Sequence, residues 1–223
     1  MGAGTLNAEP RSTSDSVRID TLSTAVRQNV KDCSEAVARA NLPNAILTGC
    51  SLTYKNLSYA YLYGATLTNA NLTGAYLYGA TLTNATLTGA NLNYATLTSL
   101  NLKGAGVSYA TLRYATLYGA FLNNANLTGA ALTNAYLFGA HLTDANLTSA
   151  DLSAANLAEA DLTGASLNGA DLNGANLRQA DLRNANLTGA YLTGANLYGV
   201  TGWNTVQGKE TIRGLDTAFN VPD

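Results

Sequence analysis

Few residues in this chain could do chemistry. His141 is the only histidine, and the only cysteines are Cys33 and Cys50. The acids gather late in the chain, where Asp151, Asp161, Asp171 and Asp181 follow one another at intervals of ten. Histidine, thiol and carboxylate are the groups that most often bind metals or transfer protons, so the backbone that positions them decides what they can do.

That backbone repeats every five residues. Leucine recurs at this spacing from Leu42 to Leu197, with Val107 as the one replacement, so residues 40–199 divide into 32 blocks. The residue two before each leucine is Ala in all but three blocks, which have Cys50, Lys55 and Leu100. Such a period is neither that of a helix nor that of a flat strand.

Each block is predicted to be a short extended face followed by a tight corner. Ala and Leu lie two residues apart, so on an extended segment both side chains point inward. The residue two after each leucine is most often Gly or Asn. These residues accept the positive φ that the third position of a type II turn requires. Repetition of this unit predicts a solenoid with Leu and Ala inside.

The blocks resemble those of a known family. Ala150-Asp151-Leu152-Ser153-Ala154 and Ala125-Asn126-Leu127-Thr128-Gly129 follow the A(D/N)LxX pattern of pentapeptide-repeat proteins, and their abundance is similar to that in cyanobacterial members. The resemblance covers 160 of the 223 residues. It implies an all-β solenoid, a right-handed quadrilateral β-helix with 20 residues per coil and therefore eight coils in this chain.

The two ends of a solenoid need covers. Residues 1–16 are small and polar and are predicted to be disordered. Apolar residues at helical spacing from Val17 to Val37 predict an N-terminal α-helical cap over residues 17–39, packed on the first coil. Residues 200–223 leave the five-residue pattern and are predicted to form a C-terminal cap or tail.

Two departures from the inward pattern carry local predictions. Leu100 beside Leu102 crowds the interior and predicts a bulge. Lys55 would bury an ammonium group, which is costly, so we expect its side chain to escape outward or to reach Asp32 or Glu35 of the cap.

Composition narrows the class of function. Charged residues make up 12% of the chain, the net charge is −2 and the sequence pI is about 5.3, which argues against a polybasic nucleic-acid binder. No apolar stretch is long enough to predict a membrane span. The first sixteen residues contain no apolar run of signal-peptide length, which fits either an intracellular start or the start of a mature exported chain.

The chemistry-bearing residues do not converge in the predicted coil. With 20 residues per coil, Asp151 stacks with Asp171 and Asp161 with Asp181, on opposite faces of the rod. His141 points outward with neither Cys nor Ser beside it. We therefore expect no catalytic site, no cofactor and no metal site. The stacked aspartates are expected to be solvated carboxylates; the alternative is that a divalent ion binds between them.

Aromatic residues are the unusual feature of the predicted surface. All 13 tyrosines lie within the repeats at outward positions. One face gathers a candidate protein-binding set, consisting of Tyr76, Tyr78, Tyr118, Tyr136 and Phe138. Two interpretations stay open: the rings stabilise the β-surface by stacking, or they form an exposed patch that binds a protein or a second copy of the chain.

The two cysteines are predicted to meet. Cys33 lies on the apolar side of the predicted cap, and Cys50 replaces Ala in the first coil that the cap must cover. They are either two buried thiols or a disulfide that joins cap to rod. A disulfide would indicate a periplasmic or lumenal compartment, whereas free thiols suit the cytoplasm.

These observations favour a non-catalytic scaffold, that is, a rod that binds a partner protein. No sequence motif identifies that partner. The alternative comes from the resemblance, because some pentapeptide-repeat proteins mimic DNA and modulate type II topoisomerases. A DNA mimic needs dense negative charge. Here five cations offset six carboxylates in residues 40–199, so this alternative is disfavoured.

Overall fold

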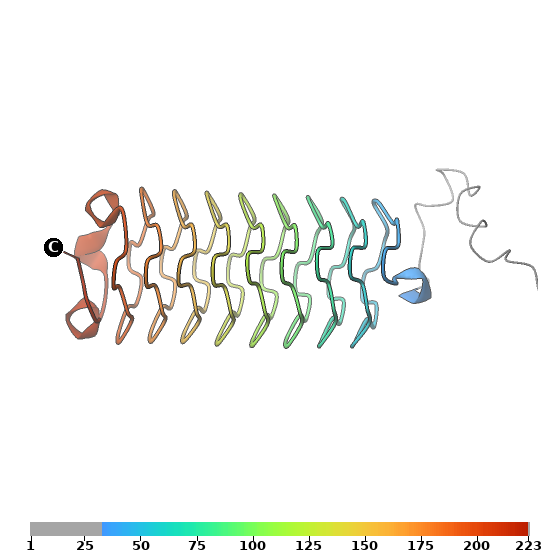
Figure 1. The fold of residues 1–223 in the computed structure, drawn as a ribbon, viewed down its shortest axis with the longest axis horizontal. Coiled ribbons are helices and arrows are strands. Elements are labelled where there is room, and N and C mark those ends of the chain that lie inside the picture. The colour runs from blue at the N-terminus through green and yellow to red at the C-terminus, as the bar shows by residue number, and fades with distance from the viewer. Residues whose placement is uncertain (1–32, 223) are drawn as a thin grey trace, which may run out of the picture.

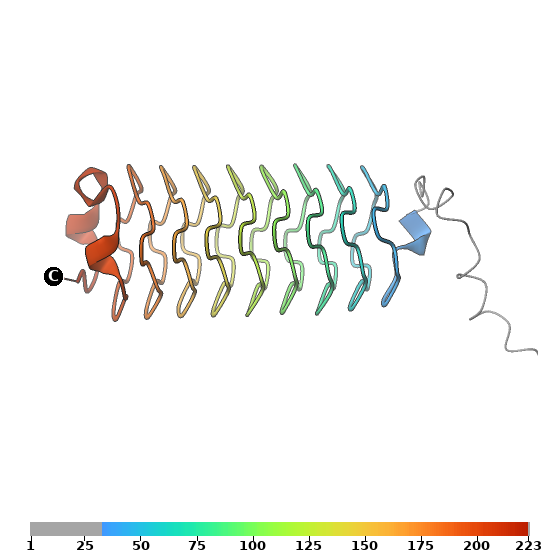
Figure 2. The same ribbon diagram turned by 90° about the horizontal axis from the view of Figure 1, so that it is seen from above.

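A computed structural model of the protein describes residues 33–222. This part of the chain forms a rod of stacked coils running from the N-terminal to the C-terminal end (Figures 1 and 2). Its only helices are single 3-10 turns, namely η2 (Cys33–Glu35), η3 (Trp203–Thr205), η4 (Lys209–Thr211) and η5 (Leu215–Thr217). Among the described residues no β-segment is longer than one bridged residue, and no helix is long and apolar enough to cross a membrane.

The coil has a register of 20 residues and four sides. Each residue that precedes a central leucine forms a parallel bridge with the residue 20 later, from Asn41 with Tyr61 to Asp181 with Thr201. We name the four sides by their first central leucine: side A begins at Leu42, side B at Leu47, side C at Leu52 and side D at Leu57. Each side then recurs every 20 residues.

One block on side C shows how the backbone groups are paired. Thr111 N–H donates to the carbonyl of Ala90 in the preceding coil (2.9 Å), and Leu112 N–H donates to that of Ala131 in the following coil (2.7 Å). Ala115 N–H closes the corner on Leu112 (3.1 Å). The coils are thus held to one another by hydrogen bonds that no isolated coil could make.

Asn and Asp precede the central leucine for a reason visible in the structure. The N–H of the residue after that leucine lies outside the ladder, and the side-chain oxygen of the Asn or Asp accepts it. Asn71 Oδ1, for example, accepts the N–H of Thr73 at 3.1 Å. The A(D/N)L pattern therefore satisfies a backbone donor locally.

Every corner has the predicted geometry, including those without Gly or Asn. The second residue after each of the 32 centres has a φ between +53° and +68°. Five of them are tyrosines, which rarely adopt this conformation. At Tyr109 the next coil makes room, because a Cβ on Gly129 would lie only 2.7 Å from the Tyr109 ring. The ring of a corner tyrosine thus replaces the side chain that its glycine neighbour lacks.

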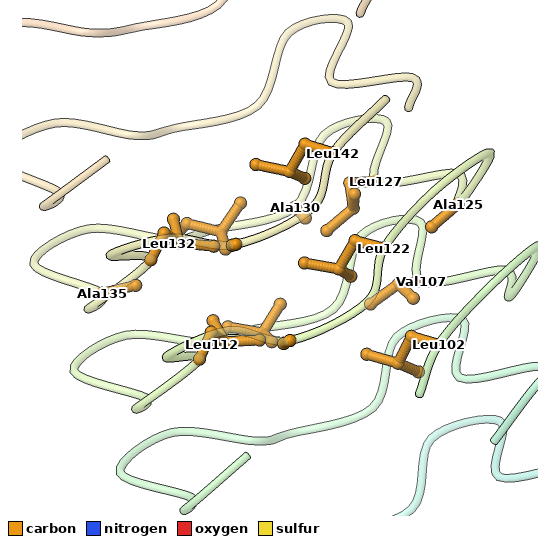
Figure 3. Packing of buried hydrophobic residues seen from close by; sticks show 14 of the residues in the cluster. Leu102, Val107, Leu112, Leu122, Ala125, Leu127, Ala130, Leu132, Ala135 and Leu142 are labelled. Atoms are coloured by element: carbon orange, nitrogen blue, oxygen red, sulfur yellow. The ribbon is translucent and has the colours of Figure 1, made fainter. Parts of the chain in front are cut away.

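Leucine and alanine fill the interior in regular columns. Figure 3 shows Leu102, Leu122 and Leu142 stacked above one another, with Val107 and Leu127 in a neighbouring column. The predicted bulge at Leu100 is wrong: its side chain is fully buried, and the bridges from Thr81 to Asn101 and from Asn101 to Phe121 keep the register. The same coil contains Val107, the one centre smaller than Leu, which offsets part of the added volume.

The described N-terminal residues differ from the predicted cap helix. Residues 17–32 lie outside the described part of the chain, and residues 33–38 contain only η2. The first corner begins directly afterwards, since Arg39 has a φ of +59° and Ala40 N–H donates to Val37. An α-helix cannot continue into a corner that needs a positive φ, so it does not reach residue 38.

Lys55 is partly exposed, which agrees with an outward escape. Among residues 33–222 the one ion pair joins Arg183 and Asp181, so Lys55 is not paired with Glu35. The other proposed partner, Asp32, lies outside the described residues.

Residues 200–219 form one more coil, with larger corners. Their period is six rather than five: Gly202, Gly208 and Gly214 alternate with Thr205, Thr211 and Thr217. The bridge separation accordingly grows from 20 at Thr201 to 21 at Gln207, 22 at Arg213 and 23 at Phe219. Each added residue is taken up by one of the turns η3, η4 and η5.

Candidate protein-interaction surface

Three of the five predicted aromatic residues form a contact cluster in the middle of side D. Tyr136 and Phe138 lie one coil after Tyr118, whose ring meets theirs edge to face at centroid distances of 6.1 and 6.4 Å. Between 41 and 44% of each residue is exposed. We call these three residues the aromatic cluster. Edge-to-face packing restricts the rings, so binding a partner would cost them little conformational entropy.

The other two predicted residues lie elsewhere on side D. Tyr76 and Tyr78 precede the cluster by two coils, and Thr98 stands between Tyr78 and Tyr118 in the column of outward residues. The ring of Tyr78 instead meets that of Tyr59 at 5.4 Å. The structure therefore divides the predicted set into two groups.

A shallow groove continues from the aromatic cluster toward the C-terminal end. Two hollows of about 270 and 210 Å³ lie along side D and share Arg178 as a lining residue. The first extends from Phe138 over Ala158 to Arg178, and the second from Arg178 to Tyr198. Ala158 opens the groove because it is the only alanine in a column of otherwise larger side chains. That column is readable from the sequence, because its members recur at intervals of 20.

Amides line the floor of this groove. Asn176 Nδ2 donates to Asn156 Oδ1 (3.1 Å), and Asn220 Nδ2 donates to Asn196 Oδ1 (3.1 Å). The Arg178 guanidinium lies 5.2 Å from the centre of the Tyr198 ring, which holds the cation at the edge of the groove. Together with Glu159 it supplies the only full charges of the two hollows, so the surface is polar but nearly neutral.

The late aspartates stack in two pairs, which lie on opposite sides of the rod. Asp151 and Asp171 are bridged on side C, and Asp161 and Asp181 on side A. Asp151 accepts from Thr133 Oγ1 at 2.6 Å and Asp161 from Thr143 Oγ1 at 2.8 Å. No group of three or more His, Cys, Asp or Glu residues suited to a metal ion occurs in residues 33–222.

Hydrogen bonds stabilise the charged form of three of these carboxylates, those of Asp151, Asp161 and Asp181. Burial raises the pKa of Asp151, but donors from Ser153 and Thr133 outweigh it, so the pKa lies below its usual value. The same balance lowers the pKa of Asp161, with donors from Thr163 and Thr143. For Asp181 the largest cause is the Arg183 side chain, which lowers the pKa. Carboxylates stabilised as anions are poor proton donors near neutral pH.

His141 belongs to a surface stack and not to a site of convergent polar groups. Its ring lies parallel to that of Phe121 at 4.9 Å, and Lys103 approaches the Phe121 ring at 5.4 Å. These residues lie on side A, across the corner from the aromatic cluster.

Cys33 and Cys50 are joined by a disulfide, with Cα atoms 5.6 Å apart. The bond links η2 to the inward column of the first coil, and 4% of Cys50 is exposed.

Known proteins are similar to this chain over nearly the whole rod. A sequence model described as pentapeptide repeats matches in eight copies, over residues 37–69, 70–105, 108–144, 140–179 and 170–201. No curated protein matches the sequence. Among solved structures is HetL from the cyanobacterium Nostoc, a pentapeptide repeat protein involved in heterocyst differentiation regulation. This chain is 32% identical to HetL, and the match covers 87% of this chain and 90% of HetL with a TM-score of 0.49.

A second solved structure shows the fold alone. QnrB1, a plasmid-mediated fluoroquinolone resistance protein, is 20% identical over 81% of this chain and 94% of its own, with a TM-score of 0.53.

Proposed function

The chain belongs to the pentapeptide-repeat family, and from this premise we propose that it is a non-catalytic rod that binds a partner protein through side D. One observation carries the proposal: the aromatic cluster of Tyr118, Tyr136 and Phe138 is exposed and preorganised beside a groove. Tyrosine and phenylalanine are enriched at protein interfaces, and hot spots favour such rings beside a hollow.

The rod suits binding because its core and its surface are independent. The inward columns are occupied almost throughout by Leu and Ala, and the hydrogen-bonded ladder repeats in each coil. Outward residues can therefore vary without a change of backbone, and the right-handed, four-sided form of the family presents them as a flat, rigid array.

The titratable groups support a binding function over catalysis. Within residues 33–222 the two aspartate pairs lie on opposite sides of the rod and His141 packs on Phe121, so these groups do not face one another across a hollow. The groove contains one acid and one cation among neutral amides.

The test is partner capture from the source organism with matched variants. The triple variant Tyr118→Ser, Tyr136→Ser, Phe138→Ser removes the cluster. The control variant Tyr94→Ser, Tyr109→Ser replaces two corner residues that lie outside the cluster and are 63 and 66% exposed. We expect one protein to be retained by the wild type and the control and to be lost with the triple variant, provided that all three melt cooperatively. Equal retention by the triple variant would remove side D as the binding surface.

A further inference from the structure

The second and third coils, together with the residues that flank them, form a belt without charge. Residues 56–102 contain no Asp, Glu, Lys, Arg or His on any of the four sides. About a quarter of residues are charged in an ordinary globular domain, and surface charge of both signs keeps such domains apart. A charged partner would find no counterion on this belt.

Five tyrosines gather on the belt around one corner of the rod, and we call them the tyrosine patch. Tyr61 and Tyr63 lie on side A, Tyr76 and Tyr78 on side D, and Tyr59 at the corner between the two sides. The exposed fractions range from 39 to 54%. The Tyr61 and Tyr63 rings are nearly parallel at 6.2 Å, and Tyr59 meets Tyr78 edge to face at 5.4 Å.

These contacts prepare the patch for association. Rings that already pack against one another lose little rotamer freedom when a partner covers them. Their hydroxyl groups remain able to donate and accept across an interface; that of Tyr63 already accepts from Asn84 Nδ2 at 3.3 Å. A partner for this patch should be aromatic, polar and uncharged.

We infer that the occupant is a second copy of this chain, bound patch to patch about a twofold axis. Such an interface is isologous, so a patch without charge meets another without charge and desolvates no ion. With the two rods antiparallel, the charged coils beyond residue 102 would point away from each other. The net charge of −2 opposes this association only weakly.

The size of the patch predicts a weak dimer. Five half-exposed tyrosines could bury on the order of 500 Å² per copy, or about 1,000 Å² in total. This is at the low end of specific interfaces, so the dissociation constant should be on the order of 10 to 100 µM.

The inference is independent of the proposed function. Thr98 separates the tyrosine patch from the aromatic cluster, so loss of dimers would leave partner binding intact, and loss of partner binding would leave dimers intact.

Sedimentation of the full chain over a range of concentrations tests the inference. We expect reversible dimers for the wild type, at least tenfold weaker association for Tyr61→Ser, Tyr78→Ser, and unchanged association for the control Tyr94→Ser, Tyr114→Ser. The control pair is also exposed and stacked, at 5.2 Å, but lies on another corner. A wild type that stays monomeric throughout, or dimers that survive the patch variant, would overturn the inference.

A second variant guards against misfolding of the serine variant. Tyr76→Lys places a cation on each copy near the twofold axis, so like charges should repel and high salt should partly restore the dimer. Dimerisation that is unaffected by this variant at low salt would equally count against the patch.

Discussion

Lys55 occupies an inward position that is tolerated because of where it lies in the rod. It belongs to the first coil, at the N-terminal end of the described rod, and its side chain remains partly exposed. One coil further along the same column, Ala75 is fully buried. An ammonium group there would have no route to water.

We therefore expect Lys55→Ala to be neutral or stabilising, and Ala75→Lys to cost several kcal/mol. Thermal melts of the two variants and the wild type test this pair of outcomes. A large loss of stability in Lys55→Ala would show that the ammonium group makes a contact that the fold needs.

Stability depends on pH through three aspartates, Asp151, Asp161 and Asp181. Their folded pKa values lie below the ordinary value of 3.8, so their contribution is complete above that pH and is lost as the pH falls through the lowered values. We expect the free energy of unfolding to fall steadily in acid below about pH 4. We expect a shallower decline of the unfolding free energy in acid for the triple variant Asp151→Asn, Asp161→Asn, Asp181→Asn. Each asparagine keeps a side-chain acceptor but does not titrate. Denaturant titrations across this range would detect the difference, and parallel declines would contradict the assignment.

At the scale of elements, the six-residue coil shows how the rod ends. Thr211 Oγ1 donates to the carbonyl of Gly208 (2.7 Å) and accepts the N–H of Gly189 in the coil before (2.8 Å). Thr205 does the same with Gly202 (2.8 Å) and Asn184 (2.9 Å). The threonine hydroxyls thus accept the backbone N–H groups of Asn184 and Gly189, which have no carbonyl partner because the corners of the last coil are larger.

Glycine is required at these corners for two reasons: the backbone has a positive φ, and a side chain would have no room. Gly208 has a φ of +70°, and a Cβ there would lie 2.6 Å from Thr188 Cα. Gly194 has a similar φ of +66° but no atom within 4 Å. Gly194→Ala should cost about 1 kcal/mol from conformation alone, and Gly208→Ala about 2 to 4 kcal/mol. Equal losses of unfolding free energy would show that the six-residue corner yields to the added methyl group.

The disulfide joins η2 to the first coil and should stabilise that end. Closing a loop across a sequence separation of 17 contributes about 3 kcal/mol in the chain-entropy model. Reductant should lower the melting temperature of the wild type and leave Cys50→Ala, which restores the usual inward residue, unaffected. Intact mass without reductant should be two hydrogens below that of the dithiol form. Two thiols that alkylate freely in the native protein would exclude the bond, and with it the prediction of an oxidising compartment.

At the scale of the whole molecule, charge distinguishes the rod from a DNA mimic. Five cations and six carboxylates are spread over residues 40–199, and the first 47 residues after Lys55 have none. Phosphate mimicry needs a continuous array of negative charge. We expect no inhibition or protection of a type II topoisomerase in a supercoiling assay; inhibition that weakens with salt would restore the DNA-mimic hypothesis.

The five-residue pattern was sufficient to predict the coil, because every block obeys the same constraint. Inward Ala and Leu, a corner that accepts positive φ and a period of five admit one backbone, and 32 repetitions leave no competing register. The position of each outward residue followed from the spacing of 20, which is how Tyr118, Tyr136 and Phe138 could be grouped.

The contacts between coils and the form of the two ends of the rod could not be predicted from the pattern and had to be seen in the folded chain. Leu100 fits without a bulge because packing volume is shared within a coil, which the local pattern does not encode. Tyr78 packs edge to face on Tyr59, a contact that depends on rotamers as well as on spacing. The groove over Ala158 and the six-residue coil arise from neighbours 20 to 23 residues away, so their form appears only when the coils are stacked.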